Sequence, residues 1–453
     1  MSTRKVSIED LPLNKFHWKI TIYTAGGPFC DGYILSVIGI ALVMMIPQLG
    51  LSSLMVGLIG TSALVGIFFG GLVFGYITDL IGRKTMYVID LLVFVVASVL
   101  QFFVGEGWQL LILRFILGVA VGADYPIATS LLAEFTPRKH RGFMLSFLVL
   151  GWWLGAVTAY IVGYLLMDLG ENSWRWILAS SAVPSVIVLL LRAGTPESPK
   201  WLVSKGRIEE ARENLRKAFG EEADIGDIPS DPPKTSFWGI FKRGYGKRTI
   251  FMSLFWMMQV IPTFAIMTFA PTVLFAFGVS EDAATLGSVV TSIFFLIGTI
   301  IAVFMINKIG RRHILIWPFL ITGIVLVALG LNPTAPLIIV VSLFAVFAIF
   351  NGGSSVLQYV YPNELFPTEV RATAVGFGTA MSRVGAAVGT FLLPLSMSGI
   401  GVGPTMIIAG ITCFIGFIVS LLMAPETLHL TLEESSRVKT EQDSEILNKK
   451  LFK

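Results

Sequence analysis

The sequence predicts an all-α membrane protein in which twelve transmembrane helices form two six-helix bundles. Apolar residues make up 55% of the chain and charged residues only 14%, and the mean hydropathy of +0.79 lies far above that of soluble globular proteins. In addition, the same polar motifs occur twice in the same order, about 229 residues apart. A duplicated set of apolar segments predicts two related halves that lie together in the bilayer.

Twelve apolar segments are long enough, or nearly so, to cross the bilayer, which takes roughly 20 helical residues. They lie near residues 19–44, 54–78, 85–104, 109–132, 143–167 and 176–193 in the first half, and near 249–276, 284–306, 313–331, 335–361, 372–395 and 403–424 in the second. We therefore expect an N-terminal bundle over residues 1–193, a cytoplasmic linker over 194–248, a C-terminal bundle over 249–428 and a cytoplasmic tail over 429–453.

The linker is the one sizeable polar segment between the halves. Ile208, Ala211, Leu215 and Phe219 recur at helical spacing with charges opposite them, which predicts a short amphipathic helix. A stretch rich in Pro, Asp and Gly follows. The linker is too small to be a catalytic domain.

The basic residues set the expected orientation. Of the 33 Lys and Arg residues, only Arg114, Arg175 and Arg383 lie outside the tails, the even-numbered connections and the central loop, counted from about Arg192 to Arg248. By the positive-inside rule those segments are cytoplasmic, so we expect a multi-pass protein of the cell membrane with both termini inside. The polar first eighteen residues lead into a full-length span, which indicates no cleavable signal peptide.

Charge and cysteine content exclude several classes of partner. The net charge of +4 follows from this topology and indicates no nucleic-acid partner. Cys30 and Cys413 both fall within apolar segments, far apart and without metal-ligand spacing, so neither a disulfide framework nor a metal site is expected.

Charged motifs stand at the expected cytoplasmic helix ends of both halves. Gly82–Lys84 returns as Gly310–Arg312, although Asn307 replaces the acid of the first copy. The positions that we single out in these motifs are Gly75, Asp79, Gly82, Arg83, Glu134, Arg141 and Glu197 in the first half and Arg311, Glu364, Arg371 and Glu426 in the second. Acids and bases at helix ends can pair across two bundles and separate when the bundles rock apart. The alternative is that the bases only fix the topology.

On these motifs the chain resembles the major facilitator superfamily, whose loop between spans 2 and 3 carries a G-x-x-x-D-x-x-G-R-[KR] pattern. Within it, Pro196–Leu202 and Pro425–Thr427 resemble the sugar-porter-like and metabolite:H⁺ symporter branch. The resemblance covers nearly the whole chain and implies a monomeric transporter. It also implies a cytoplasmic salt-bridge network that stabilises the outward-facing state.

Four charged residues lie well inside the apolar segments: Asp31, Arg114, Asp124 and Arg383. A charge at the bilayer centre costs roughly 2.5–3.5 kcal/mol on insertion scales, so such residues usually face a wet cavity or a partner. None has a charged counterpart at the repeat spacing, which indicates that they serve chemistry and not the duplicated scaffold. Asp90, nearer the cytoplasmic end of span 3, is instead expected to be an interfacial partner of nearby bases.

The resemblance implies a proton-coupling role for three of these residues. In the resembling families an acid in span 1 pairs with an arginine in span 4 and exchanges a proton, and Asp31 and Arg114 match those positions. Asp124, in a G-x-D-Y-P context, is the second candidate proton carrier. Burial favours the protonated carboxyl and a nearby guanidinium favours the ionised one, so moving the pair apart would change its protonation. The alternative for each acid is a purely structural ion pair.

The expected solute is a small organic anion, such as an aromatic acid or a sugar acid, carried with H⁺ and without any other cofactor. The glutamine pairs and the G-P-x-x-W element of hexose porters are largely missing. The candidate substrate residues are Tyr125, Trp152, Trp153, Trp256, Gln259, Gln358, Tyr359 and Arg383. An arginine suits a carboxylate, and aromatic rings suit a planar or hydroxylated body. A sugar:H⁺ or phosphate:H⁺ symporter remains an alternative, and packing is the alternative role for the aromatic residues.

Other functions find less support in the sequence. A drug exporter of this superfamily would carry a proline in span 5, and residues 143–166 contain none. The four histidines stand in tails or at cytoplasmic helix ends, so no catalytic constellation is indicated and the protein is not expected to be an enzyme. A nutrient sensor on the same scaffold is the remaining rival, although such proteins commonly carry long cytosolic extensions.

Overall fold

The computed structural model describes residues 6–7, 12–137, 140–192, 196–220, 223–224, 237–242, 244–428 and 435–436. Helices of the first half are α1 (Lys15–Leu49), α2 (Ser53–Ile81), α3 (Arg83–Leu100), α4 (Gly107–Phe135), α5 (Arg141–Leu166), α6 (Ser173–Ala179) and α7 (Ala182–Arg192). Those of the second half are α10 (Gly246–Thr268), α11 (Ala270–Ala276), α12 (Glu281–Ile309), α13 (Arg311–Leu331), α14 (Leu337–Ser355), α15 (Leu357–Leu365), α16 (Thr368–Ile400) and α17 (Val402–Met423).

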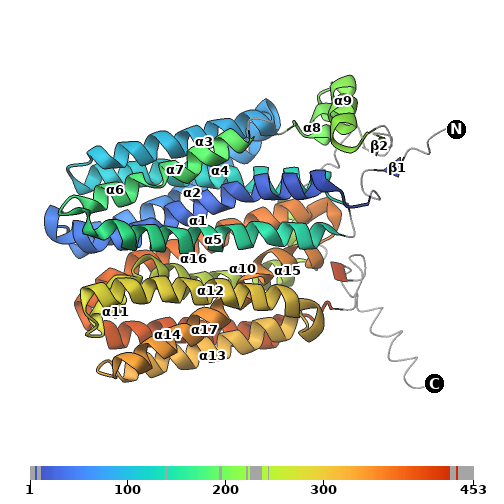
Figure 1. Cartoon of the computed structure of the whole chain (residues 1–453). Coiled ribbons are helices and arrows are strands. Elements are labelled where there is room, and N and C mark those ends of the chain that lie inside the picture. The colour runs from blue at the N-terminus through green and yellow to red at the C-terminus, as the bar shows by residue number, and fades with distance from the viewer. Residues whose placement is uncertain are drawn as a thin grey trace, which may run out of the picture.

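The prediction of twelve transmembrane helices is confirmed within the described residues, because twelve helical segments are long and apolar enough to span a membrane. Span 6 consists of α6 and α7, and span 10 of α14 and α15. The helices of the first half lie together on one side of the molecule and those of the second half on the other (Figure 1).

In both halves, glycine lets an equivalent pair of helices approach closely, α2 with α4 in the first half and α12 with α14 in the second. In the first half, a Cβ at Gly122 would lie 2.7 Å from the backbone nitrogen of Gly71, between α4 and α2. In the second half, a side chain at Gly298 of α12 would overlap the carbonyl of Ile349 in α14. Small residues allow this close approach of helix backbones in membranes. The repeated motifs of the sequence therefore correspond to a repeated packing scheme.

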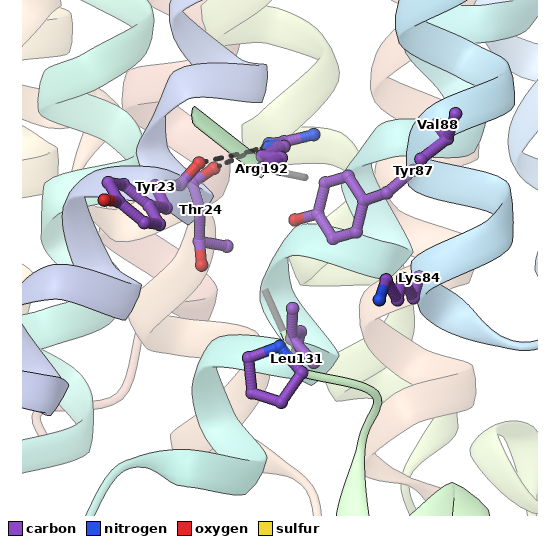
Figure 2. A pocket seen from close by; sticks show the side chains of 8 residues that line it. Tyr23, Thr24, Lys84, Tyr87, Val88, Leu131 and Arg192 are labelled. Atoms are coloured by element: carbon purple, nitrogen blue, oxygen red, sulfur yellow. Dashed lines mark hydrogen bonds between the residues drawn. The ribbon is translucent and has the colours of Figure 1, made fainter. Parts of the chain in front are cut away.

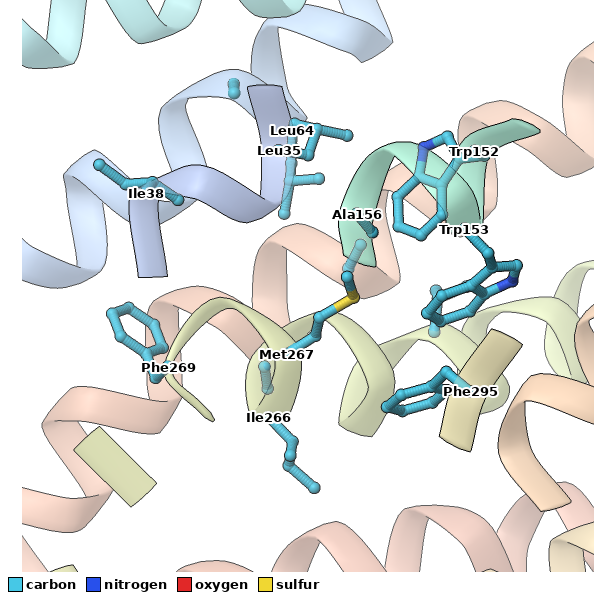
Figure 3. Close-up of a cluster of buried hydrophobic side chains, with 14 of the residues drawn as sticks. Leu35, Ile38, Leu64, Trp152, Trp153, Ala156, Ile266, Met267, Phe269 and Phe295 are labelled. Atoms are coloured by element: carbon cyan, nitrogen blue, oxygen red, sulfur yellow. The ribbon is translucent and has the colours of Figure 1, made fainter. Parts of the chain in front are cut away.

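The two halves contact each other mainly through α2 with α16 and through α5 with α12. Trp153 of α5 stacks on Phe295 of α12 with ring centroids 4.7 Å apart and an interplanar angle of 11°. Further along α5, toward its C-terminal end, the hydroxyl of Tyr160 donates to the carbonyl of Met267 in α10. Figure 3 shows the buried side chains at this seam, which include Trp152, Trp153 and Phe295.

The linker contains α8 (Pro199–Ser204), α9 (Ile208–Phe219) and the 3-10 helix Phe237–Phe241, and Ala223–Asp224 (β2) pairs in parallel with Val6–Ser7 (β1). Helices α8 and α9 protrude at the end of the molecule where α1 begins (Figure 1). Ala211 and Leu215 are buried, but Ile208 is 44% exposed and does not join their stripe. Phe219 packs on Phe16 and Phe135, with centroids 5.1 and 6.2 Å apart, and so attaches α9 to α1 and α4.

Candidate functional site

Three carboxylates of the first half are buried close together around one arginine. Asp31 of α1, Asp90 of α3 and Asp124 of α4 expose 0%, 2% and 0% of their surface, and they interact electrostatically with one another. Nη1 of Arg192, the last residue of α7, lies 3.1 Å from Oδ1 of Asp124. Isolated charges are costly inside a protein or a membrane. One contacting arginine cannot compensate three ionised acids, so the cluster favours bound protons.

A proline in α1 explains how Arg192 is held. Pro28 has no backbone N–H, so the carbonyl of Thr24, four residues earlier, lacks its usual helical donor. Nη2 of Arg192 donates to this carbonyl and its Nε donates to the carbonyl of Tyr23, each at 3.1 Å. The guanidinium also lies 3.7 Å from the ring centroid of Tyr87. Backbone, ring and carboxylate contacts together fix the cation beside Asp124.

Gly27 of α1 makes room for this ion pair. A Cβ at that position would lie 2.5 Å from Nη2 of Arg192 and 2.6 Å from Cγ of Asp124, well inside ordinary van der Waals contact. Only glycine lets the backbone of α1 pass so close to both side chains. Gly27 and Pro28 therefore both serve the ion pair of Arg192 and Asp124.

The expected pair of Asp31 and Arg114 is not formed. Nη1 of Arg114, which is 1% exposed, donates to the carbonyl of Ile34 at 2.5 Å, and neither carboxylate oxygen of Asp31 has a hydrogen-bond partner among the described residues. Ile34 lies about 4.5 Å further along α1 than Asp31. The guanidinium of Arg114 thus lies nearly one helical turn beyond the level of Asp31, and it binds the backbone of α1 instead.

The expected interfacial position of Asp90 is wrong, although Asp90 does interact electrostatically with a base, Arg192. Helix α3 begins at Arg83, so Asp90 stands seven residues, or roughly 10 Å, inside it and points into the bundle. Arg192 was not singled out either, because it ends an apolar segment and looks like a topological charge. Two signals could have identified Asp90 as buried: it stands two helical turns after Arg83, and its spacing from Tyr87 places both residues on one helix face.

Arg383 of α16 is the cation that the second half presents to this cluster. It is 6% exposed, and its guanidinium lies 5.1 Å from the ring of Tyr125 in α4 and 5.7 Å from the ring of Phe264 in α10. It acts electrostatically on Asp31 across the seam. Trp152 of α5 adds a further ring, 5.9 Å from that of Phe264. The structure thus brings together Arg383, Tyr125 and Trp152 from the candidate set.

Gln259 and Gln358 meet in a buried amide network of the second half. Nε2 of Gln259 donates to Oδ1 of Asn351 at 3.0 Å, and the hydroxyl of Thr263 donates to the same oxygen at 2.7 Å. The side-chain amide of Gln358 donates to Oε1 of Gln259. Asn351 was not predicted from the sequence, where an isolated asparagine in an apolar run carries no distinguishing pattern.

The remaining candidate aromatic residues are Trp153, Trp256 and Tyr359. Trp153 is 3% exposed and stacks on Phe295 at the seam. Trp256 is 3% exposed and packs on α16, where a Cβ at Gly378 would lie 3.1 Å from its ring. Tyr359 lies in α15, but its side chain is outside the described part of the structure.

The repeated acids of the charged motifs cap two helices. Glu197 accepts hydrogen bonds from the backbone N–H groups of Arg83 and Lys84, both at 3.1 Å, at the start of α3. Glu426 accepts from the N–H groups of Arg311 and Arg312, at 3.0 and 3.1 Å, at the start of α13. Each carboxylate neutralises a helix N-terminus and its unpaired donors.

Glycine has a defined role beside these caps. Gly82 and Gly310 precede the capped helices with φ of 111° and 95°, a conformation that residues with a side chain rarely adopt.

Further contacts of these motifs lie within the second half. Nη2 of Arg311 lies 2.9 Å from Oε1 of Glu364, and Nε of Arg371 donates to the carbonyl of Phe366 at 3.1 Å. Gly75 lies within α2. The side chains of Asp79, Glu134 and Arg141 fall outside the described residues.

Comparison with known proteins gives a consistent result. The family model for sugar (and other) transporters matches residues 16–438. The chain is 42% identical over 435 residues to the metabolite transport protein YaaU of Escherichia coli (strain K12), covering 95% of this chain and 97% of that protein. It is 38% identical to the inner membrane metabolite transport protein YgcS of the same organism, covering 97% and 98%.

A solved structure has a similar fold. The xylose transporter XylE from E. coli, in a partially occluded inward open conformation, matches with a TM-score of 0.81 at 24% identity, over 92% of this chain and 100% of that one. The relatives found in these comparisons are transporters and not enzymes.

Proposed function

Because this chain belongs to the sugar (and other) transporter family of the major facilitator superfamily, we propose that it carries a small organic anion into the cell together with protons. Family membership makes it a multi-pass membrane transporter. The buried charges support both the choice of coupling ion and the class of solute.

The observation that carries this function is the excess of buried acid over arginine in the first half. Asp31 is fully buried, and within the described part of the chain both of its carboxylate oxygens lack a hydrogen-bond partner. A carboxyl group in such a place is stable when it holds a proton and ionises only when water or a cation reaches it. A conformational change that alters access to Asp31 therefore exchanges a proton with one side of the membrane.

Arg383 supports an anionic solute. It contacts two aromatic rings, and it forms no ion pair among the described residues. A guanidinium can bind a carboxylate through two parallel hydrogen bonds, and the rings of Tyr125, Phe264 and Trp152 can stack on the body of the solute. An aromatic acid or a sugar acid fits this combination.

The placement of Arg383 near Asp31 also explains why the anion and the proton would move together. An anion at Arg383 and an ionised Asp31 would share one cation and repel each other. The anion therefore binds better when Asp31 holds a proton, and by linkage the bound anion favours protonation to the same extent. This reciprocity gives symport and not antiport.

A sugar:H⁺ symporter is the second candidate, because the amides of Gln259, Asn351 and Gln358 suit hydroxyl groups. The likeness to XylE, below 25% identity, concerns the fold alone. Phosphate is a further candidate anion for Arg383. A nutrient sensor without transport is a rival that accumulation against a gradient would exclude.

The test is uptake into proteoliposomes with an imposed pH gradient, preceded by a thermal-stability screen with aromatic acids, sugar acids, phosphate and hexoses. We expect an acid to stabilise the protein and to accumulate while the interior becomes acidic. Asp31→Asn should lose uphill uptake and retain exchange of solute between the two sides, and Arg383→Gln should lose stabilisation by the acid. Uphill uptake by Asp31→Asn, or hexose binding that survives while no acid binds, would contradict the function as stated.

Orientation and assembly complete the proposal. Both termini and the linker face the cytoplasm, as the distribution of Lys and Arg indicates, and one chain suffices for transport. Reporter enzymes fused to each terminus would check the first statement, and single-molecule counting in nanodiscs would check the second.

A further inference from the structure

A small cavity lies on the cytoplasmic side of the ion pair between Arg192 and Asp124. It measures about 10 Å³, which is enough for one water molecule. Its walls include Tyr23 and Thr24 of α1, Lys84 and Tyr87 of α3, and Arg192 of α7 (Figure 2). Lys84 is exposed and is the second residue of α3, so the cavity lies near the end of the bundle that carries the basic residues.

The cavity has a polar group that no other contact uses. The hydroxyl of Tyr87 is buried and has no hydrogen-bond partner among the described residues, and Figure 2 shows it directed toward Thr24 and Arg192. The carbonyl of Thr24, which lacks its helical donor because of Pro28, accepts one bond from Arg192 and has a second lone pair. A water molecule in the cavity would therefore find an unused hydroxyl and a carbonyl acceptor.

Arg192 separates this cavity from the acids. On one side its guanidinium contacts Asp124, and on the other it covers the ring of Tyr87. An arginine stays protonated in proteins and cannot relay a proton. A proton that leaves the acids toward the cytoplasm must therefore pass Arg192 after that side chain has moved aside. The other charged groups around this point are Asp31 on α1 and Lys84 and Asp90 on α3.

We propose that this cavity is the cytoplasmic outlet for protons, that the hydroxyl of Tyr87 relays them, and that Arg192 is the valve. The inference rests on the proposed proton coupling and extends it. The outlet runs inside the first half, between α1, α3 and α7. The solute instead leaves between the halves, where Arg383, Tyr125 and Trp152 lie. Proton and solute thus reach the cytoplasm by separate routes.

Tyr87→Phe tests the relay, because it removes the hydroxyl and keeps the ring that supports Arg192. We expect uptake driven by a pH gradient to slow by at least about tenfold. Positioned proton-transfer groups contribute roughly 10²–10⁴-fold to a rate, and the expected loss is smaller because water can partly replace the hydroxyl. Exchange of solute at equal pH should keep its wild-type rate. Tyr23→Phe is the matched control: it lines the same cavity, its hydroxyl points away in Figure 2, and both rates should stay unchanged.

Three results would decide against parts of this reasoning. Wild-type uptake by Tyr87→Phe would remove the hydroxyl from the proton route. An equal loss of uptake and exchange would assign Tyr87 a structural role only. If the wild-type protein itself took up solute without proton movement, the failure would lie in the proposed coupling and not in the outlet, so the two ideas can be told apart.

Discussion

Gly27→Ala is the sharpest test of the buried ion pair. The added methyl carbon would lie 2.6 Å from Cγ of Asp124 and 2.5 Å from Nη2 of Arg192. Since nonbonded carbon atoms settle at about 3.5 Å, the carboxylate must retreat by about 0.9 Å, and the guanidinium must move as well. Both movements act on a pair whose atoms are now 3.1 Å apart.

The expected cost follows from the burial of this pair. Breaking a buried, ion-paired contact without new partners costs about 3–5 kcal/mol of stability. We therefore expect Gly27→Ala to lower the stability of the folded protein by up to about this amount, seen as a lower unfolding temperature in detergent, and to impair proton-driven uptake. The assay is uptake into proteoliposomes at matched protein density, together with thermal unfolding of the purified protein.

Two controls make the outcome specific. Gly26→Ala adds the same methyl group one residue away, where it meets only Val188 at 2.9 Å, and should have a much smaller effect. In an Asp124→Ala background, Gly27→Ala should cost less further stability, because the carboxylate that it strikes is gone and the guanidinium of Arg192 can move into the space left. Wild-type uptake and stability in Gly27→Ala, or equal losses in Gly26→Ala, would refute the assigned role of Gly27.

Two further predictions concern the cap on α13 and the amide network. Burial opposes ionisation of Glu426, but the backbone N–H groups of Arg311, Arg312, Leu428 and Thr427 outweigh it and lower the pKa of this carboxyl below its ordinary value of 4.5. A lowered pKa stabilises the fold above about pH 4.5, and this contribution is lost as the pH falls through the folded-state value. Glu426→Gln should therefore reduce stability at pH 7 and flatten its decline in acid, and unchanged curves in thermal unfolding from pH 7 to pH 3 would contradict the cap. Asn351→Ala leaves the Gln259 amide and the Thr263 hydroxyl without their shared acceptor; we expect a loss of about 1–3 kcal/mol, measured by denaturant unfolding, whereas an unaltered protein would show that water replaces Asn351.

The sequence was sufficient for the fold because lipid imposes a simple rule. A helix of about 20 apolar residues must span the membrane, and repeated motifs such as Gly82–Lys84 and Gly310–Arg312 locate equivalent helix ends in two halves. Composition and repetition need no knowledge of how the helices are rotated. The twelve spans and the family could therefore be predicted without coordinates.

Pairings inside the bundle depend on rotation and axial position, which the sequence does not encode locally. Arg114 was expected to contact Asp31, but it reaches the carbonyl of Ile34 because the two helices are shifted by nearly one turn. Asp90 looked interfacial in sequence but is buried beside Asp124. The roles of Asp31, Asp124 and Arg383 in coupling and binding remain predictions that the experiments above address.

The stacked rings of Trp153 and Phe295 have a mechanical consequence. Parallel rings can slide over each other while most of their dispersion contacts persist, because those contacts have little directional preference. Hydrogen bonds weaken steeply when their angle departs from linear. The flat aromatic joint between α5 and α12 therefore resists tilting of one half against the other less than the hydrogen bond from Tyr160 to Met267, which also crosses the seam. The bonds from Arg192 to Asp124 and from Gln259 to Asn351 each lie within one half, where such tilting does not strain them.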